Sequence, residues 1–260
     1  MELPREVLLN IIRFDGKLVP AFFPRVAVDR EILLEVVKHC GMCLWYGNNL
    51  LRRDRRVVYE AAKQNGFAFK FAHENIWNYH MPSCRHIVVE AMKTYGHALQ
   101  HIHYRYFLDR EVVLAAVSNW GSLLKVADVM LRADREVVRT AVTNWGGALR
   151  YASLGLRSDF ELAMLAVATC PEALRWVSPN LRSNRRLVLQ AVQNDGLCLH
   201  YASAELRADR EVVLTAVRQH HGALEFASRE LREDPEVLRA ARVGFVELLF
   251  DFTYGHPPPQ

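Results

Sequence analysis

Two cysteines, Cys40 and Cys43, have the CxxC spacing that is used by half of a zinc site or by a redox dithiol. The chain contains no second CxxC that would complete a four-thiolate zinc site. In the internal repeat described below, Cys40 shares its position with Cys170, and Cys43 shares its position with Cys198 and with alanines. We therefore interpret both cysteines as core residues, and we expect no bound metal and no cofactor.

Histidines are concentrated between positions 73 and 103, and paired histidines can bind a transition metal. His97 and His101 are four residues apart, which places both on one face of a helix. The glutamate of the zinc-protease motif HExxH is missing, and Tyr151 and Tyr201 hold the repeat position of His101 elsewhere. We interpret His101 as a packed ring, and keep a metal-dependent enzyme as a third hypothesis. The histidines of this region are His73, His80, His86, His97, His101 and His103.

The rest of the sequence shows no known catalytic motif. We find no G-x-S-x-G nucleophile elbow, no Walker A loop, no Rossmann fingerprint and no pair of acids outside the predicted helix caps. No residue is a candidate nucleophile or general base, and no segment is a candidate cofactor site. We therefore predict that the protein is not an enzyme.

The sequence repeats with a period of 25 residues. The motif Asp-Arg-Glu-Val-Val begins at Asp109, Asp134 and Asp209, and looser copies lie between and beside these three. One interval is longer, with 30 residues between Asp54 and Cys84, because of an irregular insertion at about 74–82. We predict a single repeat domain over residues 1–250 and a short Pro-rich tail over 251–260. The repeats begin near residues 4, 29, 54, 84, 109, 134, 159, 184, 209 and 234.

Each repeat has the pattern of two short helices. A glycine or another turn former recurs at position 13 of the repeat, as in Gly121 and Gly146. An N-cap aspartate and a first-turn glutamate open the first helix, and the second helix repeats its apolar spacing. Helices of roughly 11 and 9 residues are marginal alone and must stack on their neighbours. The sequence thus predicts an all-α fold, an α-solenoid of about nine tandem helix-turn-helix repeats plus a partial C-terminal repeat.

Arginine recurs at position 24 of the repeat, two residues before the next cap acid. Such an arginine can neutralise the neighbouring aspartate and glutamate. We expect the recurring arginines and acids to form a structural ladder of ion pairs along the repeats. The residues at this position are Arg52, Arg132, Arg157, Arg182, Arg207 and Arg232.

The segment Asp-Arg-Glu-Val-Val-Leu-Thr-Ala-Val at 209–217, followed by Gly-Ala-Leu-Glu-Phe-Ala-Ser-Arg-Glu-Leu-Arg at 222–232, resembles the repeat of a domain-of-unknown-function family. The resemblance covers nearly the whole chain and is strongest from 109 to 240. It implies a helical repeat fold, and it brings no established activity, catalytic residue or cofactor.

The composition, 51% hydrophobic and 24% charged over 260 residues, is that of a soluble globular chain. Apolar runs are too short for a membrane span, and no secretory signal pattern opens the sequence. Five cysteines, an odd number, in a chain of this size favour a reducing compartment. We predict an intracellular protein, cytoplasmic by default, with an organellar protein whose presequence has been removed as the alternative.

Two departures from the repeat are candidate partner-binding features. The first is a basic row at position 17, which suits an acidic partner. The second is the insertion loop, where Trp77 and Tyr79 lie in a polar segment. The simpler interpretation of the basic row is a set of solvated cations on an exposed helix face. The simpler interpretation of the loop is that its two aromatic rings fold back onto the solenoid. The basic row comprises Lys70, Lys125, Arg150, Arg175 and His200, with Gln100 in the same row.

These features predict a non-enzymatic interaction scaffold or adaptor for a protein partner with an acidic surface, or an accessory structural subunit of a larger assembly. RNA binding along the basic row is the alternative. The segment Leu3-Pro4-Arg5-Glu6-Val7 also resembles the opening of an F-box, which would imply a ubiquitin-ligase adaptor. This likeness is short, and because Gly16 occupies position 13, the same segment is already explained as a first, capping repeat.

Overall fold

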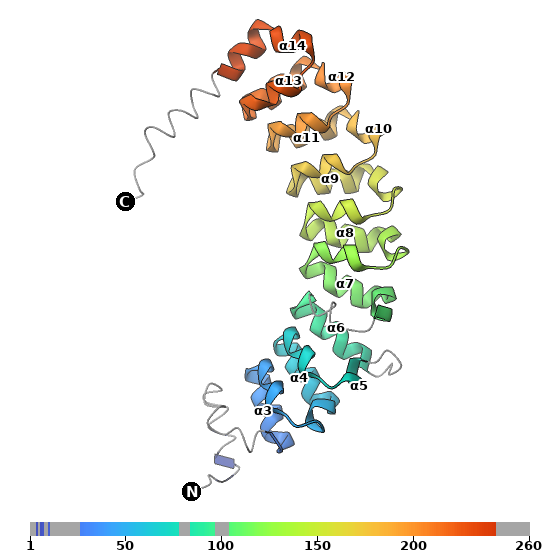
Figure 1. The fold of residues 1–260 in the computed structure, drawn as a ribbon, viewed down its shortest axis with the longest axis vertical. Coiled ribbons are helices and arrows are strands. Elements are labelled where there is room, and N and C mark those ends of the chain that lie inside the picture. Colours follow the sequence, from blue (N-terminus) through green and yellow to red (C-terminus); the bar gives the residue numbers. More distant parts are fainter. Residues whose placement is uncertain are drawn as a thin grey trace, which may run out of the picture. The chain divides into compact units, whose positions relative to one another are not determined.

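The computed structural model describes residues 27–77, 84–96 and 104–242, together with positions 4, 6, 7 and 10. Every regular element in this part of the chain is helical (Figure 1). Most of the predicted first repeat, most of the insertion and the C-terminal tail lie outside the described residues. Within the described ranges, no helix has the length and apolar character that crossing a membrane requires.

The chain forms two compact units, unit 1 over residues 1–131 and unit 2 over residues 132–260. The elements of unit 1 are α3 (Arg30–His39), η2 (Gly41–Tyr46), η3 (Leu51–Arg53), α4 (Arg55–Gln64), η4 (Gly66–Phe71), α5 (Glu74–Trp77), α6 (Arg85–Thr94), η7 (Tyr104–Leu108), α7 (Arg110–Asn119) and η8 (Gly121–Val126). A short helical turn, η9 (Leu131–Ala133), lies at the unit boundary. In unit 1, α3 packs on α4, α4 on α6 and α6 on α7.

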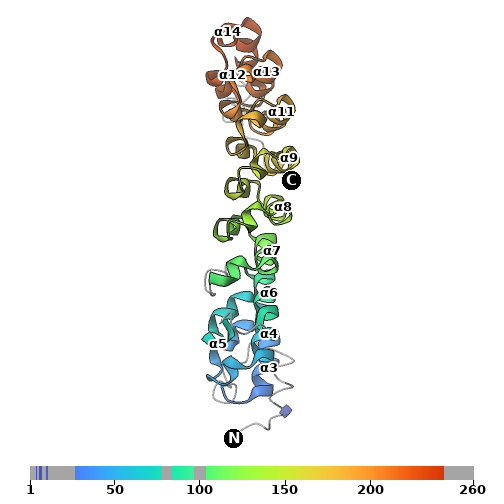
Figure 2. The same cartoon turned by 90° about the vertical axis from the view of Figure 1, so that its right-hand side faces the viewer.

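Unit 2 repeats this order of elements. They are α8 (Arg135–Asn144), η10 (Gly146–Tyr151), η11 (Leu156–Ser158), α9 (Phe160–Thr169), η12 (Pro171–Arg175), α10 (Pro179–Arg182), α11 (Arg185–Asn194), η13 (Gly196–Tyr201), α12 (Ala204–Arg207), α13 (Arg210–Gln219), η14 (His221–Phe226) and α14 (Arg229–Glu233), followed by helical residues 235–242. Here α8 packs on α9, α9 on α11 and α11 on α13. Within each unit the long helices form one column and the short helical turns a second column beside it (Figure 2). The predicted all-α repeat solenoid is confirmed.

Each long helix occupies positions 2–11 of its repeat and begins behind an N-cap. In α8, Asp134 Oδ1 accepts hydrogen bonds from the amides of Glu136 (2.9 Å) and Val137 (3.1 Å). These amides have no partner within the helix, so the cap stabilises the first turn. Positions 4, 5, 8 and 9 point into the core, where Val138 and Ala141 have no exposed surface. A helix of ten residues is marginal alone, so packing on its neighbours provides most of its stability.

The second helix of each repeat is shorter than the sequence predicted. In most repeats it is a six-residue 3-10 helix rather than a nine-residue α-helix. After η10 the chain becomes extended at Ala152 (ψ 157°). The next amide, that of Ser153, donates to the carbonyl of Arg132 in the preceding repeat at 2.9 Å. The apolar residues that suggested one nine-residue helix therefore lie in two segments, the 3-10 helix and the helical turn that follows it. The chain can leave the helix between them because the amide of Ser153 bonds to the preceding repeat instead of to its own helix.

Glycine at position 13 allows neighbouring repeats to approach closely. No described glycine has a positive φ, so the reason for glycine is not a left-handed backbone. A Cβ atom on Gly146 would lie 2.2 Å from the carbonyl oxygen of Ala166 in the next long helix. In unit 1, a Cβ atom on Gly66 would lie 2.1 Å from the carbonyl oxygen of Ala91. Position 13 therefore sets the distance between successive repeats.

Polar side chains at position 11 form a second contact between repeats. Gln219 Oε1 accepts a hydrogen bond from the Gly196 amide at 2.5 Å, and Gln219 Nε2 donates to the Asn194 carbonyl at 3.2 Å. In unit 1, Gln64 Oε1 accepts from the Gly41 amide at 2.6 Å. These bonds satisfy backbone groups near the ends of the long helices, which have no hydrogen-bond partner within the helix.

Ion pairs join the beginnings of the long helices, and position 2 supplies their arginine. Arg185 Nε lies 2.9 Å from Asp209 Oδ2 of the next repeat, and Arg185 Nη2 lies 2.5 Å from Glu211 Oε2. The arginine side chain is 45% exposed, so each pair contributes only modestly to stability. The same pairing to the next cap aspartate recurs at Arg30, Arg85, Arg135 and Arg210.

The arginine at position 24 has a different role from the one that the sequence suggested. Arg157 Nε donates to the Trp176 carbonyl, and Arg52 Nε donates to the Phe71 carbonyl, each in the next repeat. These arginines thus hold the end of the neighbouring 3-10 helix instead of neutralising the cap acids. In Arg132, Arg182 and Arg207 the Nε atom is also buried, but it forms no hydrogen bond with the described residues.

We expect Gly146→Ala to lower the free energy of unfolding by about 1–3 kcal/mol, because the new Cβ atom overpacks the contact with Ala166. Gly155→Ala is the matched control, since a Cβ atom there meets nothing within 4 Å. Its effect should be neutral or slightly stabilising, because alanine favours a helical backbone. Urea unfolding of the two variants measures the difference. Equal stability of the two variants would contradict the spacing role of Gly146.

Asp209 both caps α13 and pairs with Arg185. Burial alone would raise the pKa of its carboxyl group, but hydrogen bonds from Arg185 and from the amides of Val212 and Glu211 outweigh burial and lower that pKa below its ordinary value. The stability that this carboxylate contributes is therefore fully present above the unfolded-state pKa of about 3.9. It is lost as the pH falls through the lower folded-state pKa.

Asp209→Ala should reduce the free energy of unfolding at neutral pH by about 0.5–2 kcal/mol and weaken its dependence on acid pH. Asp209→Asn tests the two roles separately, because Asn184 already caps α11 in the same way, accepting from the Leu187 amide at 3.1 Å. This variant should keep most of the cap and lose the acid dependence. Urea unfolding at neutral and at acid pH reports both. The assignment is wrong if Asn and Ala at this position destabilise equally.

Candidate functional site

The 3-10 helices turn the same repeat positions outward along the described chain. With three residues per turn, positions 13 and 16 point together toward the core, and position 17 lies on the opposite side with position 14. In η10, Gly146 and Leu149 are buried and Arg150 is exposed. Aromatic residues, mostly half-buried, flank this outward side at position 12, where the long helix ends, and at position 18, where the 3-10 helix ends.

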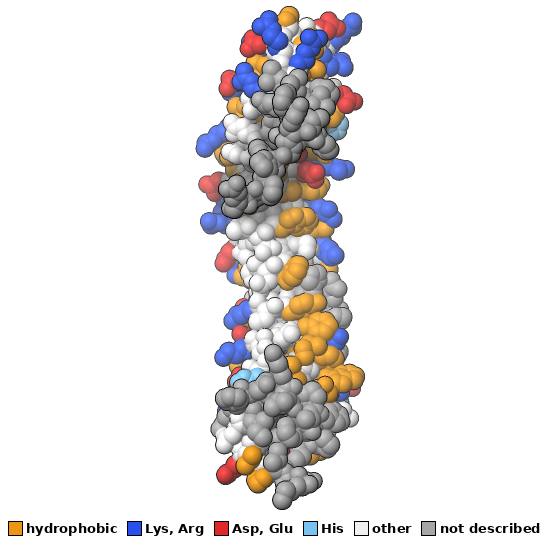
Figure 3. All heavy atoms as spheres, turned by 90° about the vertical axis from the view of Figure 1, so that its left-hand side faces the viewer, with side chains coloured by type: hydrophobic (Ala, Val, Ile, Leu, Met, Phe, Trp, Pro, Cys, Tyr) orange, Lys and Arg blue, Asp and Glu red, His pale blue; other side chains and the backbone are white. Residues whose placement is uncertain are grey.

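Each unit therefore carries a surface of aromatic and cationic side chains, which we call its aromatic–cation strip. Figure 3 shows a face on which hydrophobic side chains lie beside lysine and arginine side chains. The strip of unit 1 consists of Trp45, Phe67, Lys70, Phe71, Tyr95, Trp120 and Lys125. The strip of unit 2 consists of Trp145, Arg150, Tyr151, Arg175, Trp176, His200, Tyr201 and Phe226.

In unit 2, Arg150 lies among three aromatic rings. Its guanidinium carbon is 4.5 Å from the ring centroid of Tyr151, 5.8 Å from that of Trp176 in the next repeat, and 6.0 Å from that of Trp145. These distances are within the range of cation–π attraction. The guanidinium group remains exposed and can still meet an anion.

His200 occupies the equivalent place two repeats later. Its ring centroid lies 5.1 Å from that of Tyr201 and 4.8 Å from that of Phe226 in the next repeat. The position-17 side chain therefore bridges the position-18 rings of two successive repeats in both cases. A histidine reaches less far than an arginine from the same backbone position.

The strip of unit 1 uses partly different repeat positions, since Trp45 is at position 17 and Phe67 at position 14. The ring of Trp45 contacts that of Phe71 edge-on at 5.3 Å between centroids, and Phe67 contacts Tyr95 at 5.1 Å. Lys70 Nζ lies 3.9 Å from the centroid of the Phe67 ring. Aromatic rings thus lie beside cations on both units, each strip resting on its own stack of 3-10 helices.

All five predicted position-17 residues belong to the strips. Lys70 is half-buried against the phenylalanines, whereas the other four side chains, Lys125, Arg150, Arg175 and His200, are exposed. Trp77 is the last residue of α5, and its side chain lies outside the described part of the structure. Tyr79 and Gln100 also lie outside the described residues. Partner binding by the insertion loop stays a prediction.

The strip of unit 2 changes charge along the chain. Arg150 and Arg175 are basic, but position 17 becomes acidic at Glu225. Two further carboxylates lie beside the strip, at Glu172 in position 14 and Asp195 in position 12. One end of this strip therefore suits an anion and the other end a cation.

The CxxC pair of unit 1 lies only partly in the core, since Cys40 is half-buried. Cys43 is buried, and this burial together with the neighbouring Cys40 thiol raises the pKa of Cys43 to about 12. A thiol with this pKa is protonated at neutral pH, unlike a reactive thiolate. In the described ranges, no group of three or more His, Cys, Asp or Glu residues is placed to hold a metal ion. Four histidines of the predicted cluster, His80, His97, His101 and His103, lie outside those ranges.

The aromatic part of the strips was not predicted from the sequence. Tyr151 and Tyr201 at position 18 were interpreted as packed rings, and Trp120, Trp145 and Trp176 were not singled out. The signal that could have revealed them is the recurrence of aromatic residues at two fixed positions flanking the basic row. Their partial exposure follows only from the 3-10 geometry, which the apolar spacing does not reveal.

The fold and the strips define a tandem α-helical repeat protein with a recurring outward surface. The family model of the domain of unknown function DUF4116 matches residues 29–77, 84–132, 134–182, 184–232 and 209–241. The chain belongs to the DUF4116 family. Each of the first four matches spans two 25-residue repeats, so the family's own repeat corresponds to a pair of them. Comparisons with curated proteins and with solved structures gave no match.

Proposed function

We propose that the protein is a non-enzymatic adaptor that binds a protein partner through its aromatic–cation strips. The observation that supports this role is the repeated outward placement of aromatic rings beside cations. Trp45 is 60% exposed and Trp120 is 44% exposed, although large apolar residues of a repeat protein normally fill its core. Tryptophan, tyrosine and arginine are also the residues that contribute most to binding free energy in protein interfaces.

The cations suit a partner that carries acidic residues around an apolar anchor. Lys125, Arg150 and Arg175 are exposed and would attract such a partner over a distance, which chiefly raises the association rate. The aromatic rings would bury apolar surface after contact, which chiefly slows dissociation. We infer that charge and aromatic area act on different steps of binding.

The framework behind the strips supports tight binding because it is already ordered. Each 3-10 helix is held by hydrogen bonds to the neighbouring repeat, such as those of Ser153 with Arg132 and of Arg157 with Trp176. A surface that is rigid before binding loses little conformational entropy on binding. An extended array of this kind is a common platform for partner proteins in larger assemblies.

Single-stranded RNA is a second candidate, because aromatic rings beside cations also stack bases and neutralise phosphates. The arrangement around Arg150 favours this candidate. The carboxylates of Glu172, Asp195 and Glu225 along the strip of unit 2 oppose it, because they would repel a phosphate backbone. A protein partner accommodates both signs of charge.

Charge reversal at Lys125, Arg150 and Arg175 should reduce recovery of the native partner by roughly tenfold, because it replaces attraction by repulsion in both strips. The matched control reverses three exposed cations on the long helices, Lys63→Glu, Arg139→Glu and Arg218→Glu, and changes the net charge equally. Affinity purification from the native source, with quantitative mass spectrometry, compares the two variants with the unmodified chain.

The adaptor proposal predicts that recovery survives the control substitutions and ribonuclease treatment. Recovery that disappears with ribonuclease would instead assign the strips to RNA. Unchanged recovery with the strip variant, while circular dichroism shows it to be folded, would place the binding surface elsewhere.

A further inference from the structure

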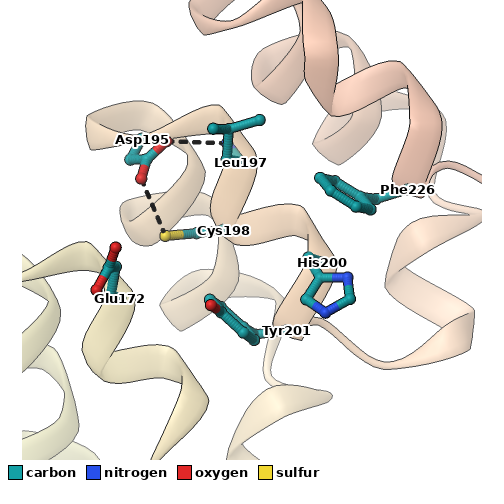
Figure 4. A pocket seen from close by; sticks show the side chains of 7 residues that line it. All are labelled: Glu172, Asp195, Leu197, Cys198, His200, Tyr201 and Phe226. Carbon is teal, nitrogen blue, oxygen red and sulfur yellow. Dashed lines mark hydrogen bonds between the residues drawn. The ribbon is translucent and has the colours of Figure 1, made fainter.

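A cavity of about 200 Å³ opens on the strip of unit 2, between the 3-10 helices η12, η13 and η14. Figure 4 shows Glu172 and Asp195 on one side of the cavity and Phe226 on the other, with His200 and Tyr201 between them. The lining thus combines two carboxylates with aromatic rings. This combination is the chemistry that recognises an organic cation.

The two carboxylates bring negative charge that the described residues leave uncompensated. Glu172 is exposed, and Asp195 caps η13 by accepting from the Leu197 amide at 3.0 Å. Neither forms an ion pair with a lysine or arginine of the described chain, although Arg175 follows Glu172 by three residues. A carboxylate that caps a helix turn keeps lone pairs for a further donor.

Cys198 forms the floor between the carboxylates, with its sulfur 3.7 Å from Asp195 Oδ2. Burial, followed by the negative charges of Asp195 and Glu172, raises the pKa of the Cys198 thiol. The charge of the cavity therefore comes from its carboxylates. Among the described residues, no group of three or more His, Cys, Asp or Glu is placed to hold a metal ion, and the aromatic lining suits an organic cation.

The chain itself shows which cation fits between the rings of two successive repeats. At Arg150 a guanidinium group lies beside the position-18 rings of Tyr151 and Trp176. At the equivalent place two repeats later, His200 lies between the rings of Tyr201 and Phe226, and the cavity opens beside its imidazole toward Glu172 and Asp195. The cavity thus lies next to the position at which Arg150 places a guanidinium group in its own repeat.

We propose that this cavity binds an arginine side chain of the protein partner. The guanidinium plane would pack against the Tyr201 ring, beside His200, and donate hydrogen bonds to Glu172 and Asp195. Arginine suits the site better than lysine because its flat group both stacks and donates in two directions. This inference rests on the proposed adaptor function and adds a feature of the partner: an arginine beyond the acidic residues that meet Arg150 and Arg175.

The spacing of the two sites limits the partner sequence. Arg150 and the cavity are separated by two repeats of unit 2, or roughly 16–20 Å at the usual distance between packed helices. An extended chain covers this distance in about five or six residues. The partner segment should therefore carry its acidic residue and its arginine about five or six residues apart.

The direct test uses N-acetylarginine methylamide as the probe and N-acetylcitrulline methylamide as its neutral isostere. Nuclear magnetic resonance titration of the full chain should show saturable shifts at the amides of Leu197, Cys198 and His200. We expect the arginine compound to bind at least roughly tenfold more tightly than the citrulline compound, because only the arginine is a cation.

Two variants tie the binding to the cavity. Glu172→Gln with Asp195→Asn should remove the preference for arginine, while Glu205→Gln with Glu230→Gln, the same loss of charge at exposed residues outside the cavity, should preserve it. His200→Arg should block the probe with both carboxylates intact, because it supplies a guanidinium group from the chain.

Equal binding of the arginine and citrulline compounds, or equal loss of binding in both charge-removing variants, would overturn the proposal. Its failure is distinguishable from failure of the adaptor function. Without arginine binding, loss of the native partner on charge reversal of the strips would still support an adaptor. If the arginine compound binds but no partner is recovered, the arginine site would be supported and the adaptor function would not.

Discussion

The repeat depends on one close contact, the approach of the position-13 backbone to a carbonyl oxygen of the next long helix. A Cβ atom on Gly41, Gly66 or Gly146 would lie only 2.4, 2.1 or 2.2 Å from that oxygen. Removing a side chain here lets the 3-10 helix of one repeat reach the long helix of the next. The alanine that carries the oxygen, as in Ala166, is itself fully buried and small. Distance and register between repeats are thus set by backbone atoms.

The other contacts between repeats follow from this register. With the helices at a fixed offset, position 2 reaches the next cap aspartate, position 11 reaches back to the preceding helix end, and position 24 reaches the next 3-10 helix. Arg185 with Asp209, Gln219 with Gly196, and Arg157 with Trp176 show the three contacts in turn. Each is modest alone. Repeated from neighbour to neighbour, they stabilise the array, and they turn position 17 outward beside the aromatic rings.

The sequence predicted the fold class, the period and the cap aspartates, because those features depend on local spacing. It did not predict the 3-10 geometry, since the apolar rhythm through Ala148 and Leu156 is the same whether one helix or two segments carry it. It assigned Arg157 to the cap acids, although the carbonyl partner lies in the next repeat and is visible only once the repeats are stacked. The basic row was found from charge alone. The cavity beside His200 required the packing of three repeats, which no local pattern contains.

Wherever position 13 is glycine, its close contact couples that repeat to the next, and Gly196→Ala tests this coupling most directly. The new Cβ atom would lie 2.2 Å from the Ala216 carbonyl oxygen in α13 of the following repeat. Hydrogen–deuterium exchange of this variant, read by mass spectrometry, should show faster exchange across Arg210–Gln219 as well as around Gly196. Exchange that changes only within the repeat of Gly196 and leaves α13 fully protected would contradict the account.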